Sequence, residues 1–392
     1  MKKNLTLIFA LTLLLGGCVQ THKEIKPYVN FLKKQNTTAK DYVLSLFENY
    51  DIVILCERDH RDITQYNLIL DIMRDQYFID NVGVVFTEIG EPELNPKLNN
   101  FLQNPHLTEL EINEQLLYFQ RNADFPLWEK SNFSYFIKGI YDINKEITEK
   151  KLKMYPTDIW HIEGQPTLEK VRDLWFTKVE HRDSLMADNF IERFDELKQK
   201  NPRQKALVIQ NYRHAFRIHA YNADGEKIDN NVGKFLFDKY PNRVANVMIN
   251  SAGNGEIGAN NDITFTTIQN GKWDASFQKA NKYNIGFNFK GSPFGNDSFD
   301  YWAFENNFTY TDMFTGFVFY QPIEKFEIAV GVSGLMDDGW LEKFYDRINL
   351  FFQVLERPLL DNKNDLMPYN DIRISNVEDL DGIKSQIQKW LK

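Results

Sequence analysis

The sequence predicts an α/β fold with a central, mostly parallel sheet flanked by helices, a helical cap insertion and a β-rich C-terminal extension. Several short apolar runs, rich in β-branched residues and bounded by polar ones, are typical of strands buried in a parallel sheet. Between them the apolar residues recur at helical spacing. Four of the runs lead directly to an ionisable or polar group, and in open α/β sheets ligands bind outside the carboxyl ends of the strands.

In chain order, the runs that predict strands are residues 51–56, 82–87, 152–157, 206–210 and 244–249. Apolar residues at helical spacing predict helices at 63–78, 179–200 and 232–240, the last with Asn230 or Asn231 placed to cap it. Residues 92–151 are predicted to be mostly helical and lie between two predicted strands, which indicates an insertion over the strand ends.

The C-terminal third differs in character. Residues 251–271 are rich in Gly and Asn and predict loops with short strands, and Ser375-Asn376-Val377-Glu378 has the pattern of a capping box before a last amphipathic helix. No linker separates independent units. We therefore predict one α/β domain over residues 41–355, with an insertion at about 92–151 and a C-terminal extension over 356–392.

The first residues predict export. A basic start, Met1-Lys2-Lys3, precedes an apolar stretch from Leu5 to Leu15 that is too short to span a bilayer permanently. It ends in Leu15-Gly16-Gly17-Cys18, which resembles the lipobox of bacterial lipoproteins. The resemblance implies a signal peptide over residues 1–18, acylation of Cys18, a tether over 19–40 and a place in the bacterial cell envelope, at the outer membrane. An ordinary secretory signal is the alternative.

The net charge argues against a nucleic-acid partner, and the cysteine content excludes an intramolecular disulfide. A formal net charge of -9 argues against nucleic acid as a partner, because phosphate binding needs clustered Lys and Arg. With Cys18 acylated, Cys56 is the only other cysteine, so no intramolecular disulfide is available. Cys56 closes a strand run and is expected to be a small buried hydrophobe, with a nucleophilic thiol as the alternative.

Ionisable residues follow the strand runs and form the candidate site. Glu57 and His60 follow the first run, Glu88 the second, Asp158 the third, and His214 comes after the fourth. A carboxylate one turn from a histidine can fix its tautomer and leave the second ring nitrogen free as a general base. Crowded carboxylates are expected to raise one another's pKa values. Glu57, His60, Glu88 and His214 are also competent ligands for a divalent metal.

These residues suggest a family. The order Glu57-x-x-His60, Glu88, helical insertion, Asp158 resembles the erythromycin esterase superfamily, and residues 181–189, His-Arg-Asp-Ser-Leu-Met-Ala-Asp-Asn, look like its RD-x-x-Met-Ala-x-Asn helix. A strand and a histidine-bearing loop, residues 211–214, follow as in that family. The resemblance implies a hydrolase of esters or amides acting on a small molecule, without a cofactor. The implied roles are His60 as base, Glu57 and Glu88 beside it, His214 and Asn211 at the oxyanion or leaving group, and Asp158, Arg182 and Tyr212 as pocket residues.

Three positions depart from the family pattern. Cys56 and Arg61 stand where glycines are usual, and Asn211 stands where a histidine often does, which puts macrolide esterase activity in doubt. The ChaN-like haem-binding lipoproteins share the Glu and His pattern and the lipid anchor. Two alternatives therefore stay open: a non-enzymatic binder of haem or another small ligand through Tyr212 and His214, and a metal-dependent hydrolase using the same residues.

Overall fold

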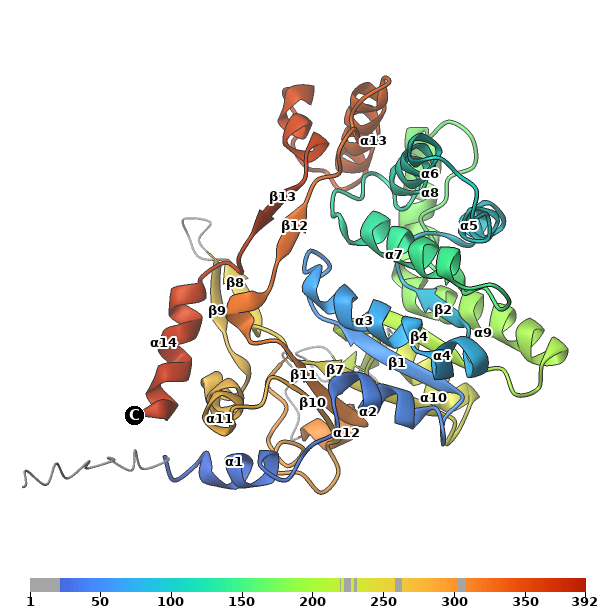
Figure 1. Ribbon diagram of the computed structural model, residues 1–392. Coiled ribbons are helices and arrows are strands. Elements are labelled where there is room, and N and C mark those ends of the chain that lie inside the picture. The colour runs from blue at the N-terminus through green and yellow to red at the C-terminus, as the bar shows by residue number, and fades with distance from the viewer. Residues whose placement is uncertain (1–21, 219, 222–226, 229–230, 258–262, 302–307) are drawn as a thin grey trace, which may run out of the picture.

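The computed structural model describes residues 22–218, 220–221, 227–228, 231–257, 263–301 and 308–392 (Figure 1). Cys18 and the signal segment lie outside the described residues, so the acylation stays a prediction. Within the described ranges, no helix is long and apolar enough to cross a membrane.

A seven-stranded sheet forms the centre of the molecule, in the order β10-β11-β7-β1-β4-β2-β3. Every neighbouring pair is parallel except β10 with β11. The strands are β1 (Ile52–Glu57), β2 (Val84–Thr87), β3 (Lys153–Pro156), β4 (Ala206–Asn211), β7 (Val244–Ile249), β10 (Asn284–Asn288) and β11 (Gly316–Tyr320). The predicted α/β class is confirmed, and the five predicted runs are β1, β2, β3, β4 and β7.

Both faces of the sheet are buried, which explains the continuous apolar runs. In β1, Val53 and Leu55 join one hydrophobic core, whereas Ile54 and Cys56 join the core on the opposite face. Cys56 is a free, buried thiol whose pKa burial raises well above the usual value. A thiolate is the nucleophilic form, so the expected role as a buried hydrophobe holds and the nucleophile alternative does not.

Helices of the first half of the chain cover one face. They are α2 (Ala39–Leu46), α3 (Thr64–Arg74), α4 (Gln76–Asn81), α5 (Asn95–Leu102), α6 (Glu109–Arg121) and α7 (Asn132–Glu146). The last three form the predicted helical insertion between β2 and β3. Helix α7 packs on α3, and the loop 122–131 before it brings Trp128 to the candidate site, where its ring centroid lies 5.1 Å from that of His60.

The other face is covered by α1 (Lys26–Leu32), α9 (Arg182–Lys200), α10 (Val232–Lys239) and α11 (Lys272–Ala280). Tyr28 and Leu32 of α1 are buried in this core, and α1 packs against α11. The described part of the expected tether, from residue 22 onward, is therefore attached to the domain, because its apolar residues fall on one face of a helix.

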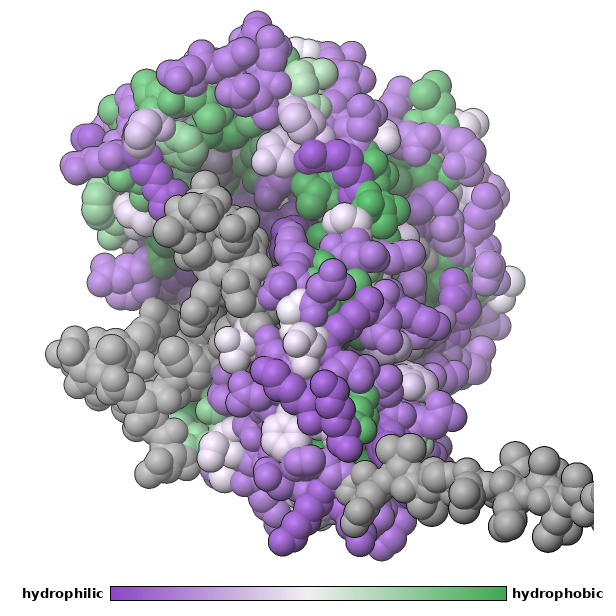
Figure 2. All heavy atoms as spheres, turned by 90° about the vertical axis from the view of Figure 1, so that its left-hand side faces the viewer, coloured by the Kyte–Doolittle hydropathy of each residue, from purple (hydrophilic) through white to green (hydrophobic). Residues whose placement is uncertain are grey.

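The remaining elements lie in the C-terminal part and at the edges of the sheet. The helices are α8 (Leu168–Thr177), α12 (Tyr310–Met313), α13 (Trp340–Val354) and α14 (Leu380–Leu391), and the strands are β5 (Ala220–Tyr221), β6 (Lys227–Ile228), β8 (Asn254–Ile257), β9 (Ile263–Thr266), β12 (Ile328–Val330) and β13 (Arg373–Ser375). The expected short strands after residue 251 are β8 and β9. Seen from the side of α14, the surface is mainly hydrophilic (Figure 2).

The expected capping box at Ser375 is wrong. Helix α14 starts after Asp379, whose side chain accepts a hydrogen bond from the Gly382 backbone N–H. Glu378 is instead held by Arg61, with 2.7 Å between the Arg61 Nη1 and Glu378 Oε1 atoms. Ser375 itself pairs with Ile328 as the last residue of β13, so it lies too far before α14 to cap it.

Strand β12 joins two loops that surround the strand ends. The Ala329 N–H donates to the Arg61 carbonyl at 2.7 Å, and the Gly331 N–H donates to the Glu129 carbonyl at 2.7 Å. Ser131 adds a hydroxyl bond to the Gly331 carbonyl. On its other edge β12 pairs with β13, and the two run as a ribbon toward α13 (Figure 1). The loop after β1 is thereby fixed to the loop before α7.

Candidate active site

Four neighbouring strands bring the predicted polar residues to one edge of the sheet. Glu57 and Asn211 are the last residues of β1 and β4, Glu88 follows β2, and Asp158 lies just beyond β3. All four are at most 5% exposed. The predicted convergence at the carboxyl ends of the strands is therefore observed.

Glu57 and His60 form a buried pair. Glu57 Oε2 lies 2.7 Å from His60 Nδ1, while Oε1 accepts hydrogen bonds from the Tyr66 hydroxyl at 2.6 Å and from Asn132 Nδ2 at 3.2 Å. A carboxylate is only an acceptor, so Nδ1 carries the proton that is shared with Glu57. In the neutral ring, Nε2 is consequently left unprotonated and faces the strand ends.

The surroundings of His60 raise its basicity. Burial lowers the pKa of His60, but the negative charges of Glu57 and Glu88 outweigh burial and hold the pKa above its usual 6.5. A base with a pKa near the working pH combines a useful unprotonated fraction with a strong affinity for the proton.

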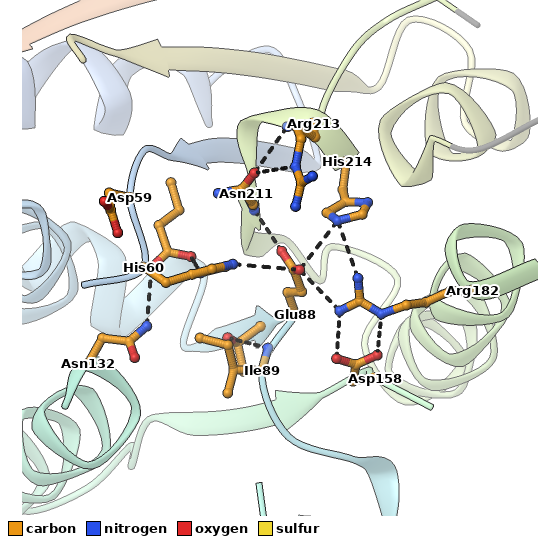
Figure 3. A network of polar contacts seen from close by, with 12 residues as sticks. Asp59, His60, Glu88, Ile89, Asn132, Asp158, Arg182, Asn211, Arg213 and His214 are labelled. Atoms are coloured by element: carbon orange, nitrogen blue, oxygen red, sulfur yellow. Dashed lines mark hydrogen bonds and ion pairs between the residues drawn. The ribbon is translucent and has the colours of Figure 1, made fainter. Parts of the chain in front are cut away.

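Glu88 lies at the centre of the site, with His60 on one side and His214 and Arg182 on the other (Figure 3). Its Oε1 atom is 3.9 Å from His60 Nε2, 3.4 Å from His214 Nε2 and 3.1 Å from Arg182 Nη2. Its Oε2 atom accepts from the Asn211 backbone N–H at 2.8 Å.

Burial by itself raises the pKa of Glu88. The neighbouring His214, His60 and Arg182 lower it by more than burial raises it, so the pKa of Glu88 is well below its usual range. The expected rise in carboxylate pKa is thus wrong for Glu88, because the Arg182 guanidinium and the two imidazoles beside it favour its ionised form. Glu88 is a fixed negative charge.

Arg182 and Asp158 form a two-point ion pair. Arg182 Nε and Nη2 donate to the two oxygens of Asp158 at 2.8 and 2.7 Å, and Arg182 Nη1 lies 3.3 Å from His214 Nε2. Burial lowers the pKa of Arg182, yet the negative charges of Asp158 and Glu88 leave it well above the usual value. The guanidinium is held rigidly beside the centre of the site, and its expected role as a pocket residue stays a prediction.

Asp183 is a member of the site that sequence reasoning missed. Its carboxylate accepts from His214 Nδ1 at 2.8 Å, and its Oδ2 also accepts from the Val232 N–H at the start of α10. Asn231, expected to cap α10, makes no side-chain cap bond and donates instead to the Arg213 carbonyl; Asn230 lies outside the described residues. The signal for Asp183 was its place beside Arg182 in the Arg-Asp motif.

Asn211 and Tyr212 both make contacts within the fold. One N–H of the Asn211 side-chain amide donates to the Arg58 carbonyl at 2.8 Å and ties the end of β4 to the loop after β1, and the expected contact of its second N–H with an oxyanion stays a prediction. The ring of Tyr212 packs 4.3 Å from that of Tyr301, and burial raises the pKa of Tyr212.

The predicted metal-ligand set of Glu57, His60, Glu88 and His214 is not assembled as one, because both Glu57 oxygens already accept hydrogen bonds within the fold. Among the described residues, the group of three or more Asp, Glu, Cys or His side chains whose ligand atoms all lie within 4.8 Å of one another is Glu91, Glu93 and His161.

Comparison with known proteins gives structural likenesses of low identity. No family model and no curated protein matches the chain. A mutant of the erythromycin esterase EreC in its open conformation has 12% sequence identity and a TM-score of 0.48 over 76% of this chain and 96% of its own. A succinoglycan biosynthesis protein has 11% identity and a TM-score of 0.48, covering 76% of this chain and 97% of its own.

ChaN of Campylobacter jejuni, solved with cofacial haem, has 16% identity and a TM-score of 0.33 over 56% of this chain and 87% of its own. The structures that the chain is similar to thus include an erythromycin esterase and a ChaN protein, the two groups suggested by its sequence. Likenesses of this strength assign no activity to the chain.

Proposed function

We propose that this protein is a hydrolase of the erythromycin esterase-like type, in which His60 activates water for attack on an ester or amide of a small molecule. We further propose that acylation of Cys18 anchors it in the bacterial cell envelope, at the outer membrane. The single observation that carries the catalytic proposal is the pair of carboxylate-supported imidazoles. Glu57 holds His60 and Asp183 holds His214, and both Nε2 atoms face Glu88.

The first imidazole supplies the base. With Nδ1 donating to Glu57, His60 Nε2 accepts a proton from water, and the resulting hydroxide attacks the carbonyl carbon of the substrate. The 3.9 Å between His60 Nε2 and Glu88 Oε1 is too long for a direct hydrogen bond, so Nε2 is not occupied by Glu88. Glu57 and Glu88 stabilise the imidazolium that forms.

His214, the second imidazole, and Arg182 lie on the opposite side of Glu88 from His60 (Figure 3). The Arg182 guanidinium is a fixed positive charge beside the strand ends, and it faces the negative charge that develops on the carbonyl oxygen. When the tetrahedral intermediate collapses, the imidazolium of His60 returns its proton to the leaving oxygen or nitrogen. Asp183 orients His214, and His214 with Asp158 holds Arg182 in place.

The test is hydrolysis of a panel of activated esters and amides by the full-length chain in detergent. Replacing His60 by Ala should lower the rate by about a hundredfold to ten-thousandfold, the usual worth of general base catalysis. His106→Ala, in the loop between α5 and α6, is the matched control and should retain the wild-type rate. Unchanged turnover in a folded His60→Ala protein removes the proposal.

Haem binding is the alternative that the same preparation tests. Titration with haemin should leave the Soret band of free haemin unshifted if the site is hydrolytic, because His214 Nε2 lies 3.3 Å from Arg182 Nη1 and Tyr212 packs against Tyr301. A shifted Soret band, lost in His214→Ala or Tyr212→Phe, would instead assign the site to haem.

A further inference from the structure

A second cluster of polar residues lies beside the candidate active site. Glu91 follows β2 by a few residues, Glu93 lies in the 3-10 helix η1 (Pro92–Leu94), and His161 lies beyond β3. The ligand atoms of the three side chains lie within 4.8 Å of one another, with 3.3 Å between His161 Nδ1 and Glu91 Oε2. Together they line a cavity of about 400 Å³ that Asp124, Trp160 and other residues complete.

The carboxylates of this cavity lack the partners that buried carboxylates normally have. Glu91 is 5% exposed, and among the described residues His161 is the one side chain paired with it. Asp124, from the loop before α7, lines the same cavity, and its buried Oδ1 atom has no hydrogen-bond partner in the described part of the chain. The cavity therefore presents buried acceptor oxygens from two separate segments.

The charge balance of the cavity is negative. Three carboxylates, Glu91, Glu93 and Asp124, face it, against the guanidinium of Arg347 and the imidazole of His161. Burial raises the pKa of Glu91 to about 9, and the nearby Asp124 and Glu93 add to the rise. Burial likewise raises the pKa of Asp124 well above its usual value, with Asp158 adding to it. The carboxylates that face the cavity therefore outnumber its positively charged groups.

We propose that Glu91, Glu93 and His161 bind a divalent transition-metal ion, with Asp124 adding negative charge beside it. Two carboxylates and one imidazole suit Zn²⁺ and Mn²⁺ better than Mg²⁺ or Ca²⁺, which prefer oxygen ligands alone. Three protein ligands would leave further coordination positions open to the cavity. Because the ligands come from the segments after β2 and β3, the ion would join these two segments at the edge of the cap.

This site is separate from His60 and does not depend on the proposed hydrolysis. The ligand set also differs from the one expected from the sequence, since neither Glu88 nor His214 belongs to it. The two metal hypotheses can therefore be distinguished by substitution.

The experiment is a calorimetric titration of the full-length chain in detergent with Zn²⁺ after chelator treatment, and of Mn²⁺ by electron paramagnetic resonance. We expect one equivalent of tightly bound ion in the wild-type protein. Glu93→Gln and His161→Ala, both at exposed positions, should each weaken binding by at least about tenfold while leaving the thermal melt of the metal-free protein unchanged. Glu91→Gln should weaken it at least as much.

The control variants are His60→Ala and Glu114→Gln, which should bind the ion as the wild type does. The proposal is overturned if no saturable binding is seen, if Glu93→Gln and His161→Ala bind as the wild type does, or if His60→Ala abolishes binding. The last result would place the ion at the Glu88 site instead.

Discussion

Replacement of Glu57 by Gln should switch the tautomer of His60 without altering the shape of the site. In the wild type, Asn132 Nδ2 donates both to Glu57 Oε1 and to the Tyr66 hydroxyl. A glutamine must therefore keep its carbonyl oxygen toward Asn132 and Tyr66, because the flipped amide would place two NH₂ groups against each other. Its NH₂ group then faces His60 and donates to Nδ1.

The consequence is a base with the proton on the wrong nitrogen. When Nδ1 accepts from the glutamine, the neutral ring carries its proton on Nε2, and Nε2 can no longer take a proton from water. The loss of rate should approach that of His60→Ala, about a hundredfold to ten-thousandfold, which corresponds to about 3–5 kcal/mol of transition-state stabilisation. An acid-to-amide change that inverts a catalytic histidine's tautomer has an effect at the upper end of this range.

The assay is kcat/KM for the best activated ester at pH 8. Glu129→Gln is the matched control, since Glu129 lies on the neighbouring cap loop and pairs with Lys130. It should stay within about twofold of the wild type, a change of less than about 0.5 kcal/mol. If Glu57→Gln folds and retains wild-type kcat/KM while His60→Ala does not, the tautomer argument is refuted and Glu57 has only a structural role.

Three further predictions concern charge. Because the pKa of His60 is raised, kcat/KM should rise with pH through a midpoint above 6.5, and the stability contributed by His60 should be lost over the same pH rise; a pH–rate profile and pH-dependent melts check both. Arg182→Met leaves Asp158 and Glu88 buried without their cation and should cost about 3–5 kcal/mol in urea denaturation, and Arg182→Lys should not restore the two-point contact with Asp158. In metal-free protein, Glu91 keeps a proton up to about pH 9 that the unfolded chain loses near 4.5, so the melting temperature should fall as pH rises between these values; Glu91→Gln should flatten that fall, and parallel slopes for the two proteins would contradict it.

Most of the sheet was predictable from sequence because burial on both faces leaves a clear pattern. Runs such as 51–56 and 244–249 must be apolar throughout when each face packs against helices. The same topology made the convergence of Glu57, Glu88 and Asp158 predictable, since the carboxyl ends of parallel strands lie at one edge.

The missing parts of the site depend on contacts that no local pattern encodes. Asp183 reaches His214 only because the first turn of α9 lies beside the loop after β4. The bond from the Asn211 side-chain amide to the Arg58 carbonyl likewise forms only because the loop after β1 lies beside the end of β4. The false capping box before α14 has the same cause, because Ser375 pairs with the distant Ile328 in the β12–β13 ribbon instead of starting a helix.

The attachment of β12 to the loop after β1 determines when the candidate active site can be completed during synthesis of the chain. The five predicted strands are complete once residue 249 has left the ribosome, whereas the partners of the Arg61 and Glu129 carbonyls are Ala329 and Gly331. Domains form from the N-terminal end as the chain emerges. The sheet therefore forms before the hydrogen bonds of Ala329 and Gly331 can hold the loop that carries His60. A chain cut within β12 would keep most of its secondary structure and lose these hydrogen bonds. Loss of activity, rather than loss of helical signal, should therefore be the earlier sign of C-terminal proteolysis.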